Sequence, residues 1–310
     1  MATATNPMSG PGIPLESERI FTPLGIRFWD ITLDLPVDDG LVVRLQVGNL
    51  ASPVLNAIRT SSGVYAFFGL PGLRAAEYPA ITGIAPARTY TYVVTVQDTL
   101  GRYLPAVLVY TLDQTGAILE NGVPSAPGPR LAYLFSAPGR PSLPGLAGVS
   151  AYLIDHASQA AAAWAVVKIQ VGTDPEIWTG IADDAGRALV MVRFPVAQSL
   201  EFGSPPGAGQ VNLFNETWPL TVQVQYSPDQ LGYPLANAPN AVWPWTDTPN
   251  LKDILNDQQP ATIWADPATP VLQFTAALTL GQDLVLRSAT GSPLSSISSS
   301  LNISRGTSPI

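Results

Sequence analysis

The stretch Thr89-Tyr-Thr-Tyr-Val-Val-Thr-Val-Gln97 decides the fold class, because it carries the clearest strand pattern in the chain. Thr and Tyr interleave with Val, and β-branched and aromatic residues are the ones that favour a pleated, half-buried strand. The turn signal Asp98-Thr-Leu-Gly101 follows directly. Pro105–Leu112 then predicts the next strand.

Short strands separated by turns recur on both sides of this stretch. Upstream, nearly alternating apolar residues predict strands within Ile26–Leu35 and over Leu41–Val47, with a turn between them. Downstream, a second block echoes the first. Its predicted strands are Val149–Ile154, Trp164–Val171, Arg187–Phe194 and Trp218–Tyr226. Strands spaced by about 8–20 residues with turn signals between them predict an antiparallel β-sandwich, here an all-β chain with two of them.

Breaks in composition predict the domain boundaries. Residues 1–18 form a tail rich in small residues, and residues 19–119 form the first sandwich. The Pro- and Gly-rich residues 120–130 form a linker, and residues 131–228 form the second sandwich. Residues 229–310 begin with a Pro- and Trp-rich part and are too few to build a core of their own. We expect them either to pack on the second sandwich or to extend as a β arm onto a neighbouring subunit.

Two turns share a pattern that suggests an internal duplication. Asp98, Gly101 and Arg102 close one turn, and Asp184 with the Gly-Arg pair at 186–187 closes the other. The spacings differ, so the pattern suggests a repeat without demonstrating one.

The composition excludes several classes of function. The 310 residues include no Cys, one His, 15 Lys plus Arg and 23 Asp plus Glu, for a net charge of −8. These counts exclude disulfide frameworks, thiol chemistry and two-His metal sites, and the acidic balance argues against nucleic acid as a partner. Charged residues make only 12% of the chain, against about 25% in ordinary soluble domains. We therefore expect other chains to cover part of the surface.

The sequence predicts neither a secretory signal nor a membrane span. The N-terminus lacks the basic and apolar regions of a secretory signal. The charge-free stretches Gln230–Thr246 and Ser288–Ser304 are broken by Pro, Gly or Ser, so neither predicts a membrane span. We expect the chain in the cytoplasm, or in a particle that is assembled there.

Catalytic and metal candidates are few. His156 follows Asp155, but adjacent strand residues point to opposite faces, and no Gly-x-Ser-x-Gly elbow is present. The pairs Asp38-Asp39 and Asp183-Asp184 lie in Gly-containing turns, where Asp caps the backbone. A calcium site is the alternative there, although it needs six or more oxygen ligands. We predict no catalytic residue, no metal ligand and no cofactor.

The C-terminal segment holds the interface candidates. Trp and Arg are enriched at the energetic centres of protein interfaces, and exposed Trp can also serve as a platform for sugars. Trp243-Pro-Trp245 is the best ligand-facing motif, and we favour a subunit contact over a glycan there. The predicted interface residues are Trp243, Trp245, Trp264, Phe274, Leu284, Leu286 and Arg287.

The motif Thr60-Ser-Ser-Gly63-Val-Tyr-Ala-Phe-Phe-Gly-Leu-Pro-Gly72 resembles the turn-strand-turn of carboxypeptidase regulatory-like, or transthyretin-like, β-sandwich domains. Ile181-Ala-Asp-Asp-Ala-Gly186-Arg-Ala-Leu-Val190 is similar to the same element in the second block. The resemblance implies an Ig-like sandwich of seven strands that is usually non-catalytic.

The layout as a whole resembles proteins that accompany contractile injection systems, the phage-tail-like particles. Two sandwiches with a C-terminal extension carry this resemblance, together with the phrases Phe67–Arg74 and Gly281–Arg287. It implies a non-catalytic structural subunit of a baseplate, cap or tail, with other subunits or copies of the same chain as partners. The alternative is a carbohydrate-binding or adhesin-like module whose partner is a glycan.

Overall fold

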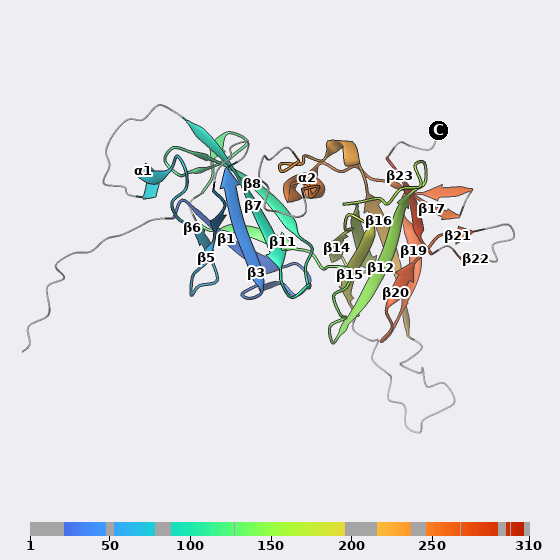
Figure 1. Ribbon diagram of the computed structural model, residues 1–310. Coiled ribbons are helices and arrows are strands. Elements are labelled where there is room, and N and C mark those ends of the chain that lie inside the picture. Colours follow the sequence, from blue (N-terminus) through green and yellow to red (C-terminus); the bar gives the residue numbers. More distant parts are fainter. Residues whose placement is uncertain are drawn as a thin grey trace, which may run out of the picture.

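The computed structural model confirms an all-β sandwich fold. Two sandwiches lie next to each other along the long axis of the molecule, the N-terminal one on the left and the C-terminal one on the right in Figure 1. The structure describes residues 22–47, 53–77, 88–126, 128–195, 216–236, 246–266, 268–290, 296–297 and 299–306.

The first sandwich packs two sheets around one apolar core. The smaller sheet has the order β11-β1-β6-β5, with β2 beside β1. Its strands are β1 (Leu24–Asp30), β2 (Leu35–Pro36), β5 (Ile58–Arg59), β6 (Tyr65–Phe67) and β11 (Arg130–Leu134). The larger sheet has the order β10-β9-β8-β7-β3-β4. Its strands are β3 (Leu41–Val47), β4 (Leu55–Asn56), β7 (Thr89–Asp98), β8 (Ala106–Asp113), β9 (Ile118–Glu120) and β10 (Val123–Pro124), and the short helix α1 spans Arg74–Glu77.

The second sandwich combines strands of the predicted second block with strands of the C-terminal segment. One sheet has the order β15-β12-β23-β17-β18, with β20 also paired to β12, and the other has the order β14-β13-β16-β19. The strands of the first of these are β12 (Leu146–Asp155), β15 (Arg187–Arg193), β17 (Thr262–Asp266), β18 (Thr269–Val271), β20 (Leu284–Leu286) and β23 (Leu301–Ser304). Those of the second are β13 (Val166–Val171), β14 (Ile177–Ile181), β16 (Thr217–Gln225) and β19 (Phe274–Thr279); β21 (Ala289–Thr290) and β22 (Ser296–Ile297) pair separately.

The central prediction of the sequence is confirmed at β7 and β8. The two strands pair antiparallel from Thr89↔Asp113 to Val96↔Ala106. Tyr92, Val94 and Val96 are buried in the core of the sandwich. Val93 and Thr95, on the opposite face, are buried as well, so the strand forms as its β-branched and aromatic residues predict but is covered on both faces.

The described part of the predicted linker, residues 120–126 and 128–130, belongs to the first sandwich and does not connect the two sandwiches. β11 begins at the end of this segment and pairs in parallel with β1, from Ile26↔Arg130 to Asp30↔Leu134. Between β10 and β11 the chain crosses from the larger sheet to the smaller one. A crossing of this kind requires Pro and Gly to end the strands, as a linker does. The passage to the second sandwich starts after β11, at Phe135.

The C-terminal segment completes the second sandwich. β17, β18, β20 and β23 belong to one sheet and β19 to the other, and Ile263, Leu278 and Ile303 are fully buried in the core. Of the two arrangements expected from the sequence, packing on the second block is the one observed. The segment cannot support a core alone, so its apolar residues are buried where open sheet positions already exist.

The duplicated turns are closer in structure than in sequence. In both Asp98–Arg102 and Asp183–Arg187, the first Asp accepts hydrogen bonds from the backbone N–H groups two and four residues later. The Arg Nε donates to the same carboxylate, at 3.1 Å in the first turn and 2.9 Å in the second. The Gly of each turn has a positive φ, +68° and +77°. The equivalent of Asp98 is thus Asp183, one residue earlier than the sequence pattern suggested.

Candidate interaction surface

The open edge of the second sandwich presents a shallow apolar groove. It lies between β19 and β20, which belong to the two different sheets. Its volume is about 300 Å³, and it is lined by Phe274, Ala276, Leu284, Val285, Leu286 and Arg287. Two sheets that end side by side without a covering strand leave part of their shared core facing outward at this edge.

Four of the predicted interface residues meet in this groove. Phe274, Leu284 and Leu286 form its apolar floor against the second core, and Arg287 is exposed at its end. They come together because the turn at residues 280–283 reverses the chain between β19 and β20. Val285, with 45% of its surface exposed, completes the groove although the sequence analysis did not name it.

The other predicted residues lie elsewhere. Trp243 and Trp245 lie outside the described residues. Trp264 is half-buried on β17, where its ring stacks on His156 with centroids 4.4 Å apart. Its indole Nε1 donates to the Ser304 hydroxyl at 2.7 Å. These contacts tie β12, β17 and β23 together, so Trp264 is engaged within its own sandwich.

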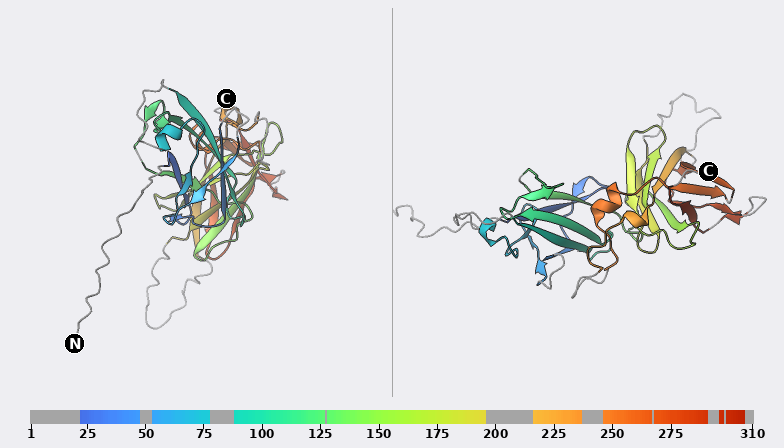
Figure 2. Two further views of the ribbon diagram at one scale, coloured as in Figure 1. Left: turned by 60° about the vertical axis from the view of Figure 1, so that its left-hand side comes forward. Right: turned by 90° about the horizontal axis from the view of Figure 1, so that it is seen from above.

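A second region joins the two sandwiches. The core cluster of the first sandwich also contains Trp164, Val166 and Ile181, which come from the second. The segment between β16 and β17 crosses the same junction, and we call its described residues, 226–236 and 246–261, the clasp. The view from above shows the clasp helix α2 (Leu251–Asn256) between the two sandwiches (Figure 2).

The clasp fills the junction closely. Leu251 and Ile254 of α2 belong to the first core, and Leu235 packs on the outer face of β7 and β8. The space that α2 shares with β8 and β11 retains a void of only about 10 Å³, the lower limit for one water molecule. Packing of this density favours a single relative position of the two sandwiches.

Trp164 marks the strained point of this junction. Its φ is +62°, a value that is rare for a bulky residue and costs conformational energy. The buried Gln258 of the clasp donates from Nε2 to the Trp164 carbonyl and accepts from the Ser227 N–H at 3.1 Å. The surrounding contacts therefore hold Trp164 in a conformation that it would not adopt alone.

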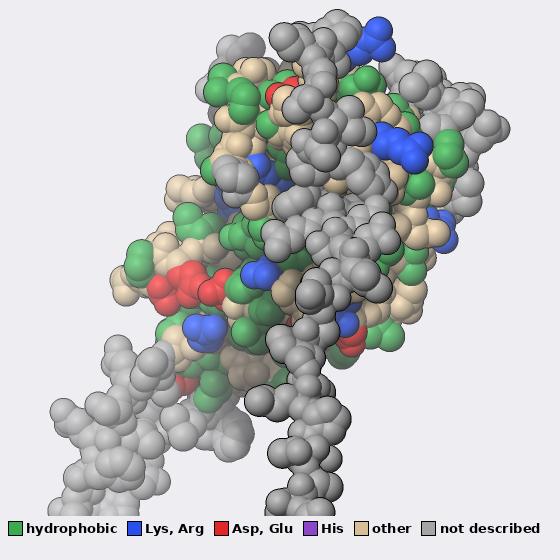
Figure 3. Space-filling view, turned by 90° about the vertical axis from the view of Figure 1, so that its left-hand side faces the viewer, with side chains coloured by type: hydrophobic (Ala, Val, Ile, Leu, Met, Phe, Trp, Pro, Cys, Tyr) green, Lys and Arg blue, Asp and Glu red, His purple; other side chains and the backbone are tan. Residues whose placement is uncertain are grey.

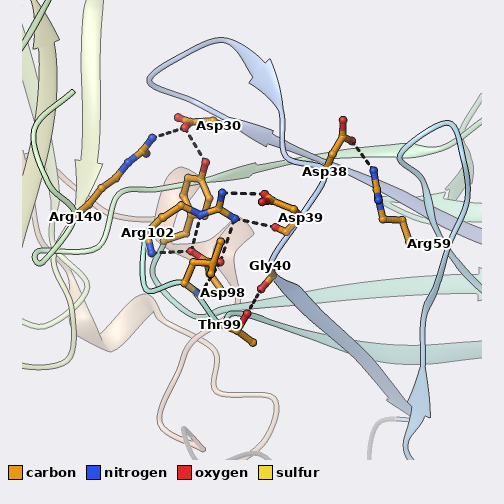
Figure 4. Close-up of polar contacts among 11 residues, drawn as sticks. Asp30, Asp38, Asp39, Gly40, Arg59, Asp98, Thr99, Arg102 and Arg140 are labelled. Atoms are coloured by element: carbon orange, nitrogen blue, oxygen red, sulfur yellow. Dashed lines mark hydrogen bonds and ion pairs between the residues drawn. The ribbon is translucent and has the colours of Figure 1, made fainter. Parts of the chain in front are cut away.

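A buried ion pair anchors the start of the connection between the sandwiches (Figure 4). Arg140 Nη2 lies 2.7 Å from Asp30 Oδ2, and the Tyr103 hydroxyl donates to the same oxygen at 2.8 Å. The guanidinium also donates to Ser136 and lies over the Tyr103 ring, 4.9 Å from its centroid. Backbone N–H groups of Thr32 and residue 33 bond the other oxygen of Asp30. Because both carboxylate oxygens of Asp30 accept hydrogen bonds from the protein, we interpret Asp30 as a structural anchor and not as a ligand-binding group.

A second polar cluster lies beside the first and also appears in Figure 4. Arg102 donates to both oxygens of Asp98 and to the carboxylate of Asp39, at 2.9 Å for the latter. Asp38 faces Arg59 at 3.7 Å in an exposed pair. The Asp38-Asp39 turn therefore pairs with two different arginines, and no group of three or more metal-ligating side chains occurs among the described residues.

These contacts shift the pKa values of the groups involved. Burial by itself raises the pKa of Asp30, but hydrogen bonds from Arg140 and Tyr103 outweigh it and hold the value below the ordinary 3.8. The pKa of Asp98 is lowered in the same way, against the effect of burial, by Arg102. Burial and the contact with Asp30 raise the pKa of Tyr103, so its hydroxyl stays a neutral donor.

The lowered pKa of Asp30 predicts a loss of stability in acid. The unfolded chain, with an Asp pKa of about 3.9, binds protons before the folded chain does. The stabilisation is therefore complete above that value and is lost as the pH falls through the lower folded pKa. We expect the urea midpoint to fall between about pH 5 and pH 2, and to fall less steeply in Asp30→Asn. Equal slopes for the two proteins would contradict this role of Asp30.

The surface carries few charges. In Figure 3, which faces the end of the first sandwich, a few basic and acidic side chains lie scattered among apolar and uncharged ones. Large apolar side chains such as Leu35, Ile58 and Leu131 are exposed on this sandwich. No helix in the described part of the chain has the length and apolar character needed to cross a membrane.

Sequence reasoning missed the junction. Asp30 and Arg140 are 110 positions apart, and a single sequence contains no signal that pairs them. Gln258 likewise reaches across 94 positions to Trp164. Only a weaker signal was available: Asp30 ends a strand pattern and Arg140 lies between Gly139 and Pro141, and both are unusual positions for a charge.

Two known structures resemble this fold only weakly. The fold defines an all-β protein with two sandwiches. No protein-family model matches the chain, and no curated protein matches it in sequence. Among solved structures, the Bacillus anthracis TIE protein aligns over 90% of this chain and 33% of its own, with 9% identity and a TM-score of 0.22. A putative adhesin from Bacteroides ovatus aligns over 66% of this chain and 72% of its own, with 8% identity and a TM-score of 0.16.

The chain thus spans about a third of the length of the TIE protein. At these TM-scores no function is transferred from either structure. The resemblance to transthyretin-like domains and to contractile injection systems stays a prediction.

Proposed function

We propose that the chain is a non-catalytic structural subunit of a multi-subunit particle. Its two sandwiches act as one rigid spacer, and the groove between β19 and β20 contacts a neighbouring subunit. Binding of this kind requires apolar surface that is open in the isolated chain and covered in the assembly. The groove offers such a surface, with Phe274 and Leu284 half-buried and Val285 exposed.

The observation that carries the proposal is the fused junction. Domains in one chain ordinarily move relative to each other unless their interface is large and apolar. Here a shared core, the buried Asp30–Arg140 pair and the clasp all cross or anchor the same junction. A rigid body of this form sets a fixed distance between the partners at its ends, which is what a spacer in an ordered particle requires.

The sequence resemblance supports a narrower assignment. We propose that the particle is a contractile injection system or a related phage-tail-like assembly, put together in the cytoplasm, with this chain in its baseplate, cap or tail. The low content of charged residues, 12% of the chain, supports extensive contact with other subunits.

A particle-incorporation assay tests the proposal. A tagged chain, expressed in its native cells, is followed through sedimentation of the lysate, and the heavy fraction is imaged by electron microscopy with a label on the tag. We expect the label at regular positions on particles. Recovery of the chain only at monomer size, with no label on any particle, would overturn the proposal.

Substitution in the groove makes the assay specific. Val285→Lys places a charge in the groove and should reduce incorporation by about tenfold or more, equivalent to about 1.4 kcal/mol of contact energy. Ile177→Lys is the matched control, because Ile177 is 59% exposed on β14 in the same sandwich and lies outside the groove. Equal incorporation of both variants would show that the groove is not the contact.

A further inference from the structure

β19 differs from the other sheet edges of the described chain in having no protection. Soluble proteins guard their edge strands with charges, prolines, bulges or short length, because a bare edge pairs with other strands. Arg59 lies in β5, Arg130 in β11, Arg187 and Arg193 in β15 and Pro270 in β18, while β4, β10 and β20 span only two or three residues. β14, the other edge of the sheet that contains β19, is also uncharged, but β15 covers it: Gly180 lies against the Leu189 backbone, and Ala182 bridges to Ala188. β19 has six residues, Phe-Thr-Ala-Ala-Leu-Thr, and pairs with β16 without a register shift.

The hydrogen-bond pattern shows which groups of β19 point outward. The Leu280 N–H donates to the Glu216 carbonyl at 3.0 Å, so these opposed residues form a hydrogen-bonded pair. Such pairs alternate along an antiparallel ladder. The backbone groups of Thr275, Ala277 and Thr279 therefore point away from β16, and the Thr279 carbonyl already accepts from the Gln282 N–H at 3.1 Å in the turn. The N–H groups of all three residues and the carbonyls of Thr275 and Ala277 face the open edge. They can form hydrogen bonds with a further strand.

We infer that this edge binds the same edge of a second copy of the chain, so that two β19 strands pair antiparallel about a two-fold axis. The inference rests on the proposed function and names the partner at the proposed contact. Pairing that uses all three outward residues places Ala277 opposite Ala277 of the partner subunit and Thr275 opposite Thr279 of the partner subunit. The two four-stranded sheets then form one continuous sheet of eight strands.

Charge is what favours a second copy as the occupant. A two-fold pair places each strand against itself, so it requires an edge without like charges, and β19 has no charge. The turn after β19 puts Asp283 at its Thr279 end, and Arg287 lies further along the returning chain, at the Phe274 end. Antiparallel pairing therefore brings Arg287 of each copy to the Asp283 end of the other. The Asp283 carboxylate accepts from the Ser142 hydroxyl and the Gly148 N–H, which fix it at this position, and it stays exposed as Arg287 does. The two ends of the interface therefore carry opposite charges.

Sedimentation velocity and native mass spectrometry of the full chain test this inference. We expect a species of twice the 32.7 kDa chain mass that increases with concentration. Ala277→Pro removes an outward N–H without removing a bond to β16, and Ala277→Lys places two positive charges opposite each other. Each variant should raise the dimer dissociation constant at least about tenfold. Val123→Lys, on the exposed edge strand β10 of the first sandwich, should leave it unchanged.

Amide hydrogen exchange locates the contact. The N–H groups of Thr275, Ala277 and Thr279 should become protected as the protein concentration rises, in the wild type and not in Ala277→Lys. A wild type that stays monomeric at every concentration, or a dimer that both Ala277 variants retain, would overturn the inference. Incorporation of a monomeric chain into particles would then leave the proposed function standing, whereas a β19 dimer that never enters particles would remove the proposed function and keep the inference.

Discussion

Arg140→Ala should lower the free energy of unfolding by about 3–5 kcal/mol, because it leaves the buried Asp30 carboxylate without its charged partner. Asp30 and Arg140 are almost fully buried, and their oxygen and nitrogen lie 2.7 Å apart. Removing one member of a buried pair costs far more than the pair contributes, since the remaining charge cannot return to water. The Tyr103 hydroxyl remains, but a neutral donor does not replace a guanidinium.

Urea denaturation measures this loss, and Arg187→Ala provides the matched control. Arg187 pairs with Asp183 at 2.7 Å in a turn of the second sandwich, with the Arg side chain 62% exposed. Exposed pairs contribute about 0–1 kcal/mol, so the control should remain close to the wild type. A loss below about 1 kcal/mol for Arg140→Ala would show that water reaches Asp30 and that the pair is not a buried anchor.

The same substitution should loosen the connection between the sandwiches. Ser136 lies at the start of that connection and accepts a hydrogen bond from Arg140 at 3.0 Å, while the Ala137 N–H donates to the Arg102 carbonyl. Amides of residues 136–140 should therefore exchange faster in Arg140→Ala at urea concentrations where both sandwiches remain folded.

Local sequence patterns predicted where the strands lie, but they did not predict which strands pair when these are far apart in the sequence. β7 and β8 follow from their Val, Thr and Tyr content, because β-branched and aromatic residues favour extended strands. That β7 is buried on both faces was not predictable, because Leu235 of a distant segment covers its second face. β11 was assigned to the second sandwich because a Pro- and Gly-rich stretch precedes it, and such a stretch is equally suitable for a loop within one domain. The parallel pairing of β11 with β1 depends on packing between strands a hundred residues apart, which no local pattern records.

That four candidate residues meet in the groove could be predicted from local sequence as well. Phe274, Leu284 and Leu286 lie on two strands that one short turn joins, and Arg287 follows directly, so proximity in sequence already places them close in space. Trp264 was grouped with them on residue type alone. The structure separates it from the groove because β17 pairs with β23 and carries the Trp ring onto His156. Residue type identifies a candidate, and only the strand order determines where its side chain lies.

Ile254→Ala in the clasp should cost about 2–5 kcal/mol, the range for removing a large aliphatic side chain from a close-packed core. Ile254 is 2% exposed and packs in the first core although its helix belongs to the segment between two strands of the second sandwich. The void that already exists beside it is only about 10 Å³, so the truncation creates a cavity that the neighbours cannot fill without moving.

The Ile254→Ala prediction bears on function because the stability that is lost comes from the contact between the two sandwiches. Lys252→Ala on the exposed side of the same helix is the control and should change stability by no more than about 0.5 kcal/mol. Calorimetry should show one transition for the wild type and two for Ile254→Ala, because the sandwiches of the variant unfold independently. If the variant loses stability and keeps one transition, the clasp adds stability without coupling the two sandwiches, and the rigid spacer would have to depend on the Asp30–Arg140 anchor alone.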